Sequence, residues 1–114
     1  MHEITLVANI IELAEKEARK AGVRSIRSIE IEIGKLSCIE KAAFDFAWMH
    51  GVKNTMLYGA ERITHFIPGE AACKSCHEVF EVEELYEACP RCGDYFSEIV
   101  HGQELRVKSI RVEE

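Results

Sequence analysis

The sequence CKSC at residues 73–76 is followed, after twelve residues, by CPRCG at residues 89–93. Two residues between a pair of cysteines allow a tight turn in which both sulfurs face one point, and Pro90 and Gly93 favour such a turn. Two pairs can together place four thiolates at the corners of a tetrahedron, which is the geometry of structural zinc sites. The four predicted zinc ligands are Cys73, Cys76, Cys89 and Cys92.

Three other uses of these cysteines compete with zinc. Disulfides are disfavoured because residues 1–22 contain four glutamates and lack the apolar run of a secretory signal, so the thiols are expected to stay reduced. The CKSCH pattern at residues 73–77 matches haem attachment, but it leaves the second pair without a role. Iron is the stronger alternative, because CPRCG also matches a rubredoxin-like knuckle, and the spacing leaves zinc and iron both open.

The charge of the chain argues against nucleic-acid binding. Its 114 residues are the length of one ordinary domain, and the formal net charge is −6. The segment between the cysteine pairs is acidic, whereas a zinc ribbon that binds phosphates needs a basic surface. No segment is apolar for long enough to span a membrane. We therefore expect a soluble, cytoplasmic protein with protein or metal partners and neither nucleic-acid nor membrane partners.

The N-terminal third predicts a helix and then a strand. Residues 3–21 show an apolar stripe with helical spacing, and Gly22 is well suited to follow the end of a helix. Residues 25–33 predict a strand with one buried face, because Ile29, Ile31 and Ile33 alternate with two glutamates. The stripe of the helix consists of Ile4, Val7, Ile11, Ala14 and Ala18, widened by Leu6, Ile10 and Leu13.

A second helix and two more strands are predicted after Gly34. Ser37 and Glu40 form a capping-box pattern at the start of a helix to about His50, with Cys38 as a small buried hydrophobe. This helix is expected to bury Phe44, Ala47 and Trp48. Residues 61–67 are strand-like, and a last strand follows Gly102 and should return beside the first two strands. The predicted fold is α+β, a small three-stranded sheet with two helices, plus an inserted zinc-ribbon module with rubredoxin-like knuckles.

Met1 and His2 indicate a second metal site. Histidine is a bulky second residue, which usually leaves the initiating methionine in place, so the mature chain should begin with the free amine of Met1. The amine and the His2 amide nitrogen can close one chelate ring on a metal, and the His2 amide and imidazole can close another. Nitrogen donors in one plane suit Ni(II) or Cu(II). From the residues alone, a solvated terminal histidine without a ligand role remains the alternative.

Several short motifs, spread over essentially the whole chain, occur together in this sequence. Met1-His2-Glu3 opens a helix, Gly34 closes the first strand, the cysteine pairs follow, and Gly102-x-Glu104-Leu105 lies near the end. Together they resemble the HypA/HybF family of nickel metallochaperones for [NiFe]-hydrogenase maturation. The resemblance implies Ni(II) at Met1, His2 and Glu3 and Zn(II) at the four cysteines. The expected domains are a nickel-binding α+β domain at residues 1–67 and 103–114 and a zinc-binding domain at residues 68–102.

The resemblance also implies a function as a carrier and not as an enzyme. The sequence itself lacks a nucleophilic triad pattern and a phosphate-binding loop. The family would deliver nickel to the [NiFe]-hydrogenase large-subunit precursor, with the GTPase HypB as a partner and, in some organisms, urease maturation as a second use. At His77 the chain departs from the family, in which glycine is common, and His77 is either a spare ligand or a surface histidine. The alternative functions are a zinc-ribbon adaptor that binds proteins and an electron-transfer protein with iron bound by the four cysteines.

Overall fold

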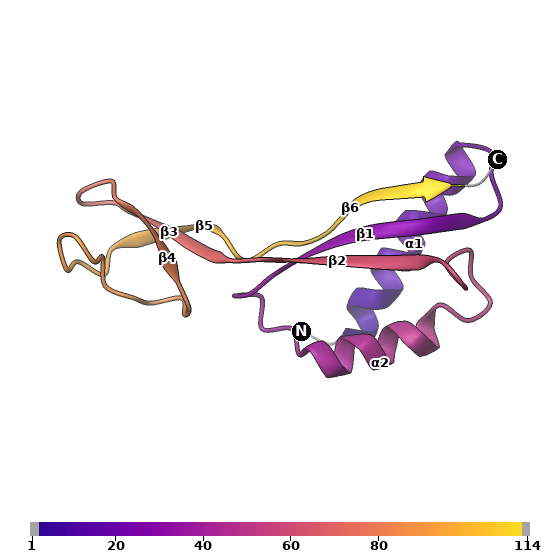
Figure 1. The fold of residues 1–114 in the computed structure, drawn as a ribbon, viewed down its shortest axis with the longest axis horizontal. Coiled ribbons are helices and arrows are strands. Elements are labelled where there is room, and N and C mark those ends of the chain that lie inside the picture. The colour runs from indigo at the N-terminus through magenta and orange to yellow at the C-terminus, as the bar shows by residue number, and fades with distance from the viewer. Residues whose placement is uncertain (1–2, 113–114) are drawn as a thin grey trace. The chain divides into compact units, whose positions relative to one another are not determined.

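Residues 3–112 are described by a computed structural model, in which they form two helices and two three-stranded sheets (Figure 1). In chain order the elements are α1 (Glu3–Lys20), β1 (Ile26–Gly34), α2 (Lys41–Gly51), β2 (Glu61–Ile67), β3 (Gly69–Cys73), β4 (Val79–Val82), β5 (Ser97–His101) and β6 (Leu105–Val112). This combination of helices and small sheets confirms the predicted α+β class. Within residues 3–112, no helix is both long and apolar enough to cross a membrane.

The chain divides into two compact units. The first unit holds the described parts of Met1–Ile31, Ile39–His65 and Arg106–Glu114, and the second holds Glu32–Cys38 and Phe66–Leu105. The second unit thus includes residues 32–38, because Leu36 belongs to its apolar cluster. The division into a nickel-binding and a zinc-binding domain stays a prediction.

The first sheet has the strand order β2-β1-β6, with β1 in the centre. The last strand of the chain therefore returns beside the first two, as predicted. Ile29 and Ile31 of β1 are fully buried, which explains the alternation seen in the sequence. Figure 1 shows α1 and α2 together on one side of this sheet.

One face of α1 supplies much of the core of the first unit. Its buried residues are Leu6, Val7, Ile10, Ile11, Ala14 and Ala18. The prediction was wrong for Ile4 and Leu13, which are 73% and 47% exposed. At 100° per residue these two positions lie at the two edges of the apolar arc, and the buried arc is narrower than predicted. After the helix, Gly22 has a φ of 75° and Val23 N–H donates to the Ala18 carbonyl oxygen at 3.2 Å, as expected for a helix terminated by glycine.

α2 begins later than the capping-box pattern predicted. Glu40 is the N-cap residue and makes no side-chain capping hydrogen bond, while the Ser37 hydroxyl donates to the Gly34 carbonyl oxygen at 2.6 Å. Cys38 is exposed, so its predicted role as a buried hydrophobe was also wrong. The reason is Leu36, which is drawn into the core of the second unit and sets the path of residues 35–38 before the helix can start. The three residues predicted to be buried on α2 are indeed buried, namely Phe44, Ala47 and Trp48.

The second unit contains a sheet that the sequence did not predict. Its order is β4-β3-β5, and both neighbours are antiparallel to β3. A small apolar cluster supports this sheet. It consists of buried Leu36, Ala71 and Val82, with Phe80 and Ile99 partly buried against them. β3 ends at Cys73, so the sheet leads directly into the first cysteine pair.

Three glycines allow the backbone to approach itself closely inside the second unit. A Cβ atom added to Gly34 would lie 1.9 Å from the carbonyl oxygen of Gly102, and one added to Gly102 would lie 2.7 Å from the Cα of Gly69. Two hydrogen bonds cross this point, from Gly34 N–H to the Glu104 carbonyl oxygen and from Leu36 N–H to the Gly102 carbonyl oxygen, both at 2.7 Å. Any side chain at Gly34 would break this arrangement.

We expect Gly34→Ala to destabilise the fold by about 3 kcal/mol, because the obstacle is backbone and cannot move aside as a side chain could. Gly22→Ala is the matched control: its Cβ would meet nothing within 4 Å, so it should cost about 1 kcal/mol for the positive φ alone. Urea unfolding followed by circular dichroism measures both losses. Equal losses in the two variants would show that the close approach at Gly34 is not required.

Candidate metal centre

The four predicted zinc ligands come from two turns of the second unit. Cys73 is the last residue of β3 and Cys76 lies in the turn that follows, while Cys89 and Cys92 lie in the turn before β5. Cys73 and Cys89 are 1% and 2% exposed, and Cys92 is exposed. The site is therefore closed on one side by the fold and reaches the surface on the other.

The two turns have the same hydrogen-bond pattern. In each, the amide of the fifth residue donates to the carbonyl oxygen of the first cysteine, and the carbonyl oxygen of the sixth residue accepts from that cysteine's amide. The bonds are His77 N–H to Cys73 O at 2.9 Å, Gly93 N–H to Cys89 O at 2.8 Å, and Cys73 N–H to Glu78 O and Cys89 N–H to Asp94 O, each at 2.8 Å. The equivalent backbone explains why two unrelated sequences, CKSC and CPRC, direct their sulfurs to one point.

The sulfur atoms are spaced for a tetrahedral metal. The Sγ atoms of Cys73 and Cys92 are 3.6 Å apart, those of Cys76 and Cys89 are also 3.6 Å apart, and all four lie within 4.8 Å of one another. A tetrahedron with metal–sulfur bonds of about 2.3 Å has edges of about 3.8 Å. Disulfides would bring paired sulfurs to about 2.05 Å, so the cysteines are free thiols. This donor set and spacing are consistent with structural zinc.

The thiols need a cation to ionise together. Hydrogen bonding from the Cys76 backbone lowers the pKa of Cys73 to about 7 despite its burial. The pKa of Cys92 rises to about 12, because the hydrogen bond from the Asp94 backbone is outweighed by the neighbouring Cys73 sulfur and by desolvation. One thiolate thus forms easily and makes the next one unfavourable. A divalent cation would remove that conflict, as zinc does when it binds several thiolates.

Contacts between the two turns were not predicted from the sequence. The Ser75 hydroxyl donates to the carboxylate of Asp94 and joins the two turns directly. The Lys74 N–H donates to the Phe96 carbonyl oxygen at 2.8 Å, and the Lys74 ammonium lies 5.0 Å from the centre of the Phe96 ring. Ser and Asp are common turn residues, so their spacing carries no signal of this pairing.

His77, which the sequence left open as a spare ligand or a surface histidine, does not join the sulfur cluster, and neither does His101. His77 is exposed and has a φ of 66°, at the position where the second turn has Gly93 with a φ of 78°. His101 on β5 lies with Nδ1 3.2 Å from a carboxylate oxygen of Glu104. Among the described residues, the groups able to hold one metal are the four cysteines.

The predicted nickel residues are placed only in part. Met1 and His2 lie outside the described residues. Glu3 is the first residue of α1 and is half-buried. Its carboxylate stands in the first turn, where a negative charge complements the helix dipole. Nickel binding by these three residues therefore stays a prediction.

Comparison with known protein families gives a match over nearly the full length. The family described as hydrogenase/urease nickel incorporation, metallochaperone, hypA matches residues 1–112. The chain is 40% identical over 110 residues to the hydrogenase maturation factor HypA of Parabacteroides distasonis, covering 96% of each chain. It is 36% identical over 113 residues to that of Geobacter metallireducens, covering 99% of this chain and all of the relative.

Solved structures show the same similarity. The solution structure of the Ni metallochaperone HypA from Helicobacter pylori superposes with a TM-score of 0.72 at 28% identity, covering 98% of this chain and 97% of the other. A second solution structure of a HypA protein gives a TM-score of 0.75, also at 28% identity, covering 99% of this chain and 97% of the other. The fold described above is thus shared with experimentally determined structures.

Cys89→Ala should release the metal and destabilise the second unit by several kcal/mol, because the apolar cluster there is small. Metal analysis of the purified protein and thermal unfolding measure the two effects. Cys38→Ala is the matched control, since this exposed cysteine lies outside the cluster and should leave zinc content and melting unchanged. An unchanged melting curve for Cys89→Ala would contradict a structural metal.

Proposed function

The chain belongs to the HypA family of nickel metallochaperones for hydrogenase maturation, and on this basis we propose where it holds its nickel and to which protein it delivers it. Nickel is bound by Met1, His2 and Glu3 and is transferred to the [NiFe]-hydrogenase large-subunit precursor. The observation that carries the proposal is the family match over residues 1–112 of a chain whose second residue is histidine. The cargo is Ni(II), and the zinc stays with the protein.

The donor atoms of the first residues suit a transferable metal. The Met1 amine, the His2 amide and the His2 imidazole can form two adjacent chelate rings around Ni(II), which favours nitrogen donors in one plane. Glu3 adds a carboxylate at the start of α1. A site built from a few donors at a chain terminus leaves room for a receiving protein to add its own ligands and to take the metal by exchange.

The zinc site is suited to a different task. Its four sulfurs lie close enough to bind one tetrahedral metal, which would leave no open position, and two of the cysteines are almost fully buried. A closed site of this kind holds its metal and does not offer it to a partner. This supports nickel binding elsewhere in the chain, at the N-terminus.

The partners follow from the family. A metallochaperone is a carrier, and we propose that the chain catalyses no reaction and works in the cytoplasm. There it would bind the nickel-loading GTPase HypB and the hydrogenase large-subunit precursor. The family description includes urease, so urease maturation factors are further candidates. A zinc-ribbon adaptor would bind no nickel, and a protein with iron at the four cysteines would be coloured and redox-active, so metal analysis separates both from the proposal.

His2→Ala should abolish stoichiometric Ni(II) binding while zinc content and the circular dichroism spectrum stay unchanged, because the variant loses the imidazole and leaves the fold untouched. Isothermal titration with Ni(II) measures the binding. His50→Ala is the matched control, an exposed histidine on α2 that should leave nickel affinity as it is. Unchanged nickel affinity in His2→Ala would refute the terminal site.

Adding residues before Met1 should also abolish stoichiometric nickel binding, since it converts the Met1 amine into an amide and removes one chelate ring. The same residues added after Glu114 are the control and should have no effect. Ni(II) titration of the two extended chains makes the comparison. If the N-terminally extended chain binds nickel as tightly as the native chain, the amine is not a ligand.

A further inference from the structure

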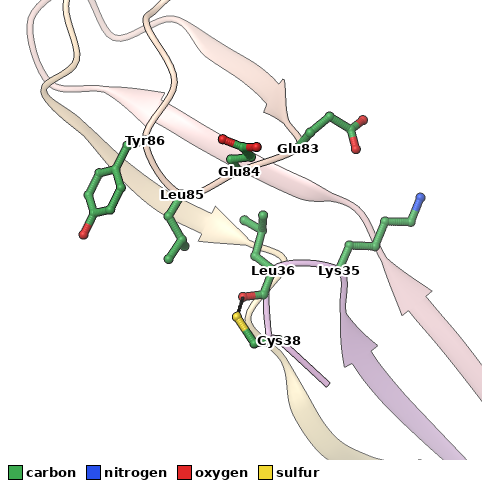
Figure 2. A pocket seen from close by; sticks show the side chains of 7 residues that line it. All are labelled: Lys35, Leu36, Cys38, Glu83, Glu84, Leu85 and Tyr86. Atoms are coloured by element: carbon green, nitrogen blue, oxygen red, sulfur yellow. Dashed lines mark hydrogen bonds between the residues drawn. The ribbon is translucent and has the colours of Figure 1, made fainter. Parts of the chain in front are cut away.

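A pocket of about 390 Å³ lies in the second unit, and none of the four metal-site cysteines lines it (Figure 2). Two segments line it, one from residues 35–38 and one from residues 83–86. Leu36 forms its floor and is 7% exposed. Figure 2 shows Leu85 and Tyr86 on one side of the pocket, with Leu36 and Cys38 facing them. The pocket therefore combines a buried apolar floor with apolar walls that remain open to solvent.

The outer wall is held in place although its apolar side chains are not buried. The carboxylate of Glu87 accepts hydrogen bonds from the amides of Glu83 and Glu84, the second at 2.7 Å, and this fixes the turn. Leu85 is 40% exposed and Tyr86 is 84% exposed. Large apolar side chains held out by a pre-organised turn are characteristic of binding surfaces, because little ordering is lost when a partner covers them.

The charges at the rim are mainly negative. Glu83 and Glu84 line the pocket, with Lys35 as its single basic residue. In the described part of the chain, neither Glu83 nor Glu84 takes part in an ion pair. Their carboxylates are free to meet cations of a partner, and the acidic residues of the neighbouring sequence strengthen the same field.

We propose that this pocket is a docking site for a basic segment of a partner protein, which inserts one large apolar side chain between Leu36 and Leu85. Lysine or arginine residues on both sides of that side chain meet Glu83 and Glu84. Charge complementarity selects this occupant: a second copy of this chain has a net charge of −6 and the same acidic rim, which disfavours it at the pocket. This docking proposal does not rest on the nickel site proposed above.

The test uses the zinc-loaded chain and short synthetic peptides with blocked ends. The first peptide has a central phenylalanine flanked by lysines, the second replaces phenylalanine by alanine, and the third replaces the lysines by glutamates. Amide chemical shifts of the ¹⁵N-labelled chain locate each binding site and give its dissociation constant. We expect the first peptide to shift the signals of residues 35–38 and 83–86 and the other two to bind at least about tenfold more weakly.

Cys38 supplies an independent readout at the same pocket. It is exposed and lies outside the sulfur cluster, so it should be the thiol that iodoacetamide alkylates first in the zinc-loaded chain. A peptide that covers it should slow this alkylation about threefold when present at twice its dissociation constant, by mass action alone. Shifts without protection of Cys38 would place the peptide elsewhere and overturn the proposal.

Variants separate the apolar contact from the charge. Leu85→Ser should weaken the first peptide about tenfold, whereas Tyr58→Ser, which removes an exposed aromatic side chain in the first unit, should not. Glu83→Lys with Glu84→Lys should transfer the preference to the glutamate-flanked peptide. Glu12→Lys with Glu61→Lys makes the same change of net charge on exposed residues of the first unit and should leave the preference unchanged.

Three further results would overturn the proposal. In the first, the lysine-flanked peptide leaves the pocket signals unmoved. In the second, the glutamate-flanked peptide binds the native chain equally well, which would remove the role of charge. In the third, the pocket signals shift with the concentration of the chain alone, which would make a second copy the occupant. Zinc content and a dispersed spectrum confirm that each variant is folded.

Discussion

The convergence of four sulfur atoms on one metal contributes more to the stability of the second unit than any apolar contact does. The apolar cluster of this unit is small, with Leu36, Ala71 and Val82 as its buried members. Such a cluster contributes too little to offset the entropy of ordering the two cysteine turns and their sheet. A metal bound by four thiolates supplies the missing free energy, because it binds the folded chain and has no preformed site in the unfolded one. The sheet leads into this site, since β3 ends at Cys73.

The helices and strands that could be predicted from the sequence are those with one buried face, because their apolar residues then recur with a regular spacing. The isoleucines of β1 and the stripe of α1 are of this kind, and both elements were correct to within about two residues. β3, β4 and β5 were missed because they are short and carry charged residues such as Glu70 and Glu81. The capping box failed for another reason: burial of Leu36 in the second unit outweighs a local hydrogen bond from Ser37.

At the metal site, the sequence predicted the four ligands but not the structure around them. The spacing of the cysteines is a local property, and the structure brings the four sulfurs together as that spacing requires. The equivalence of His77 and Gly93 depends on a backbone conformation that becomes visible only when the two turns are compared. Met1 and His2 of the proposed nickel site lie outside the described residues, so that proposal rests on donor chemistry and family membership.

A carrier that holds nickel at the proposed terminal site has to obtain its selectivity from protein contacts. Affinities of nitrogen and oxygen donors generally follow one order of divalent metals, in which copper(II) stands above nickel(II), so the terminal donors alone do not select nickel. Delivery to the correct acceptor then depends on which protein docks and on which metal is available there. An acidic surface with a pre-organised apolar pocket suits this need, because charge steers the encounter and rejects wrong partners while the pocket fixes the register. If the proposed pocket serves this docking, zinc contributes to it by ordering the unit that carries the pocket.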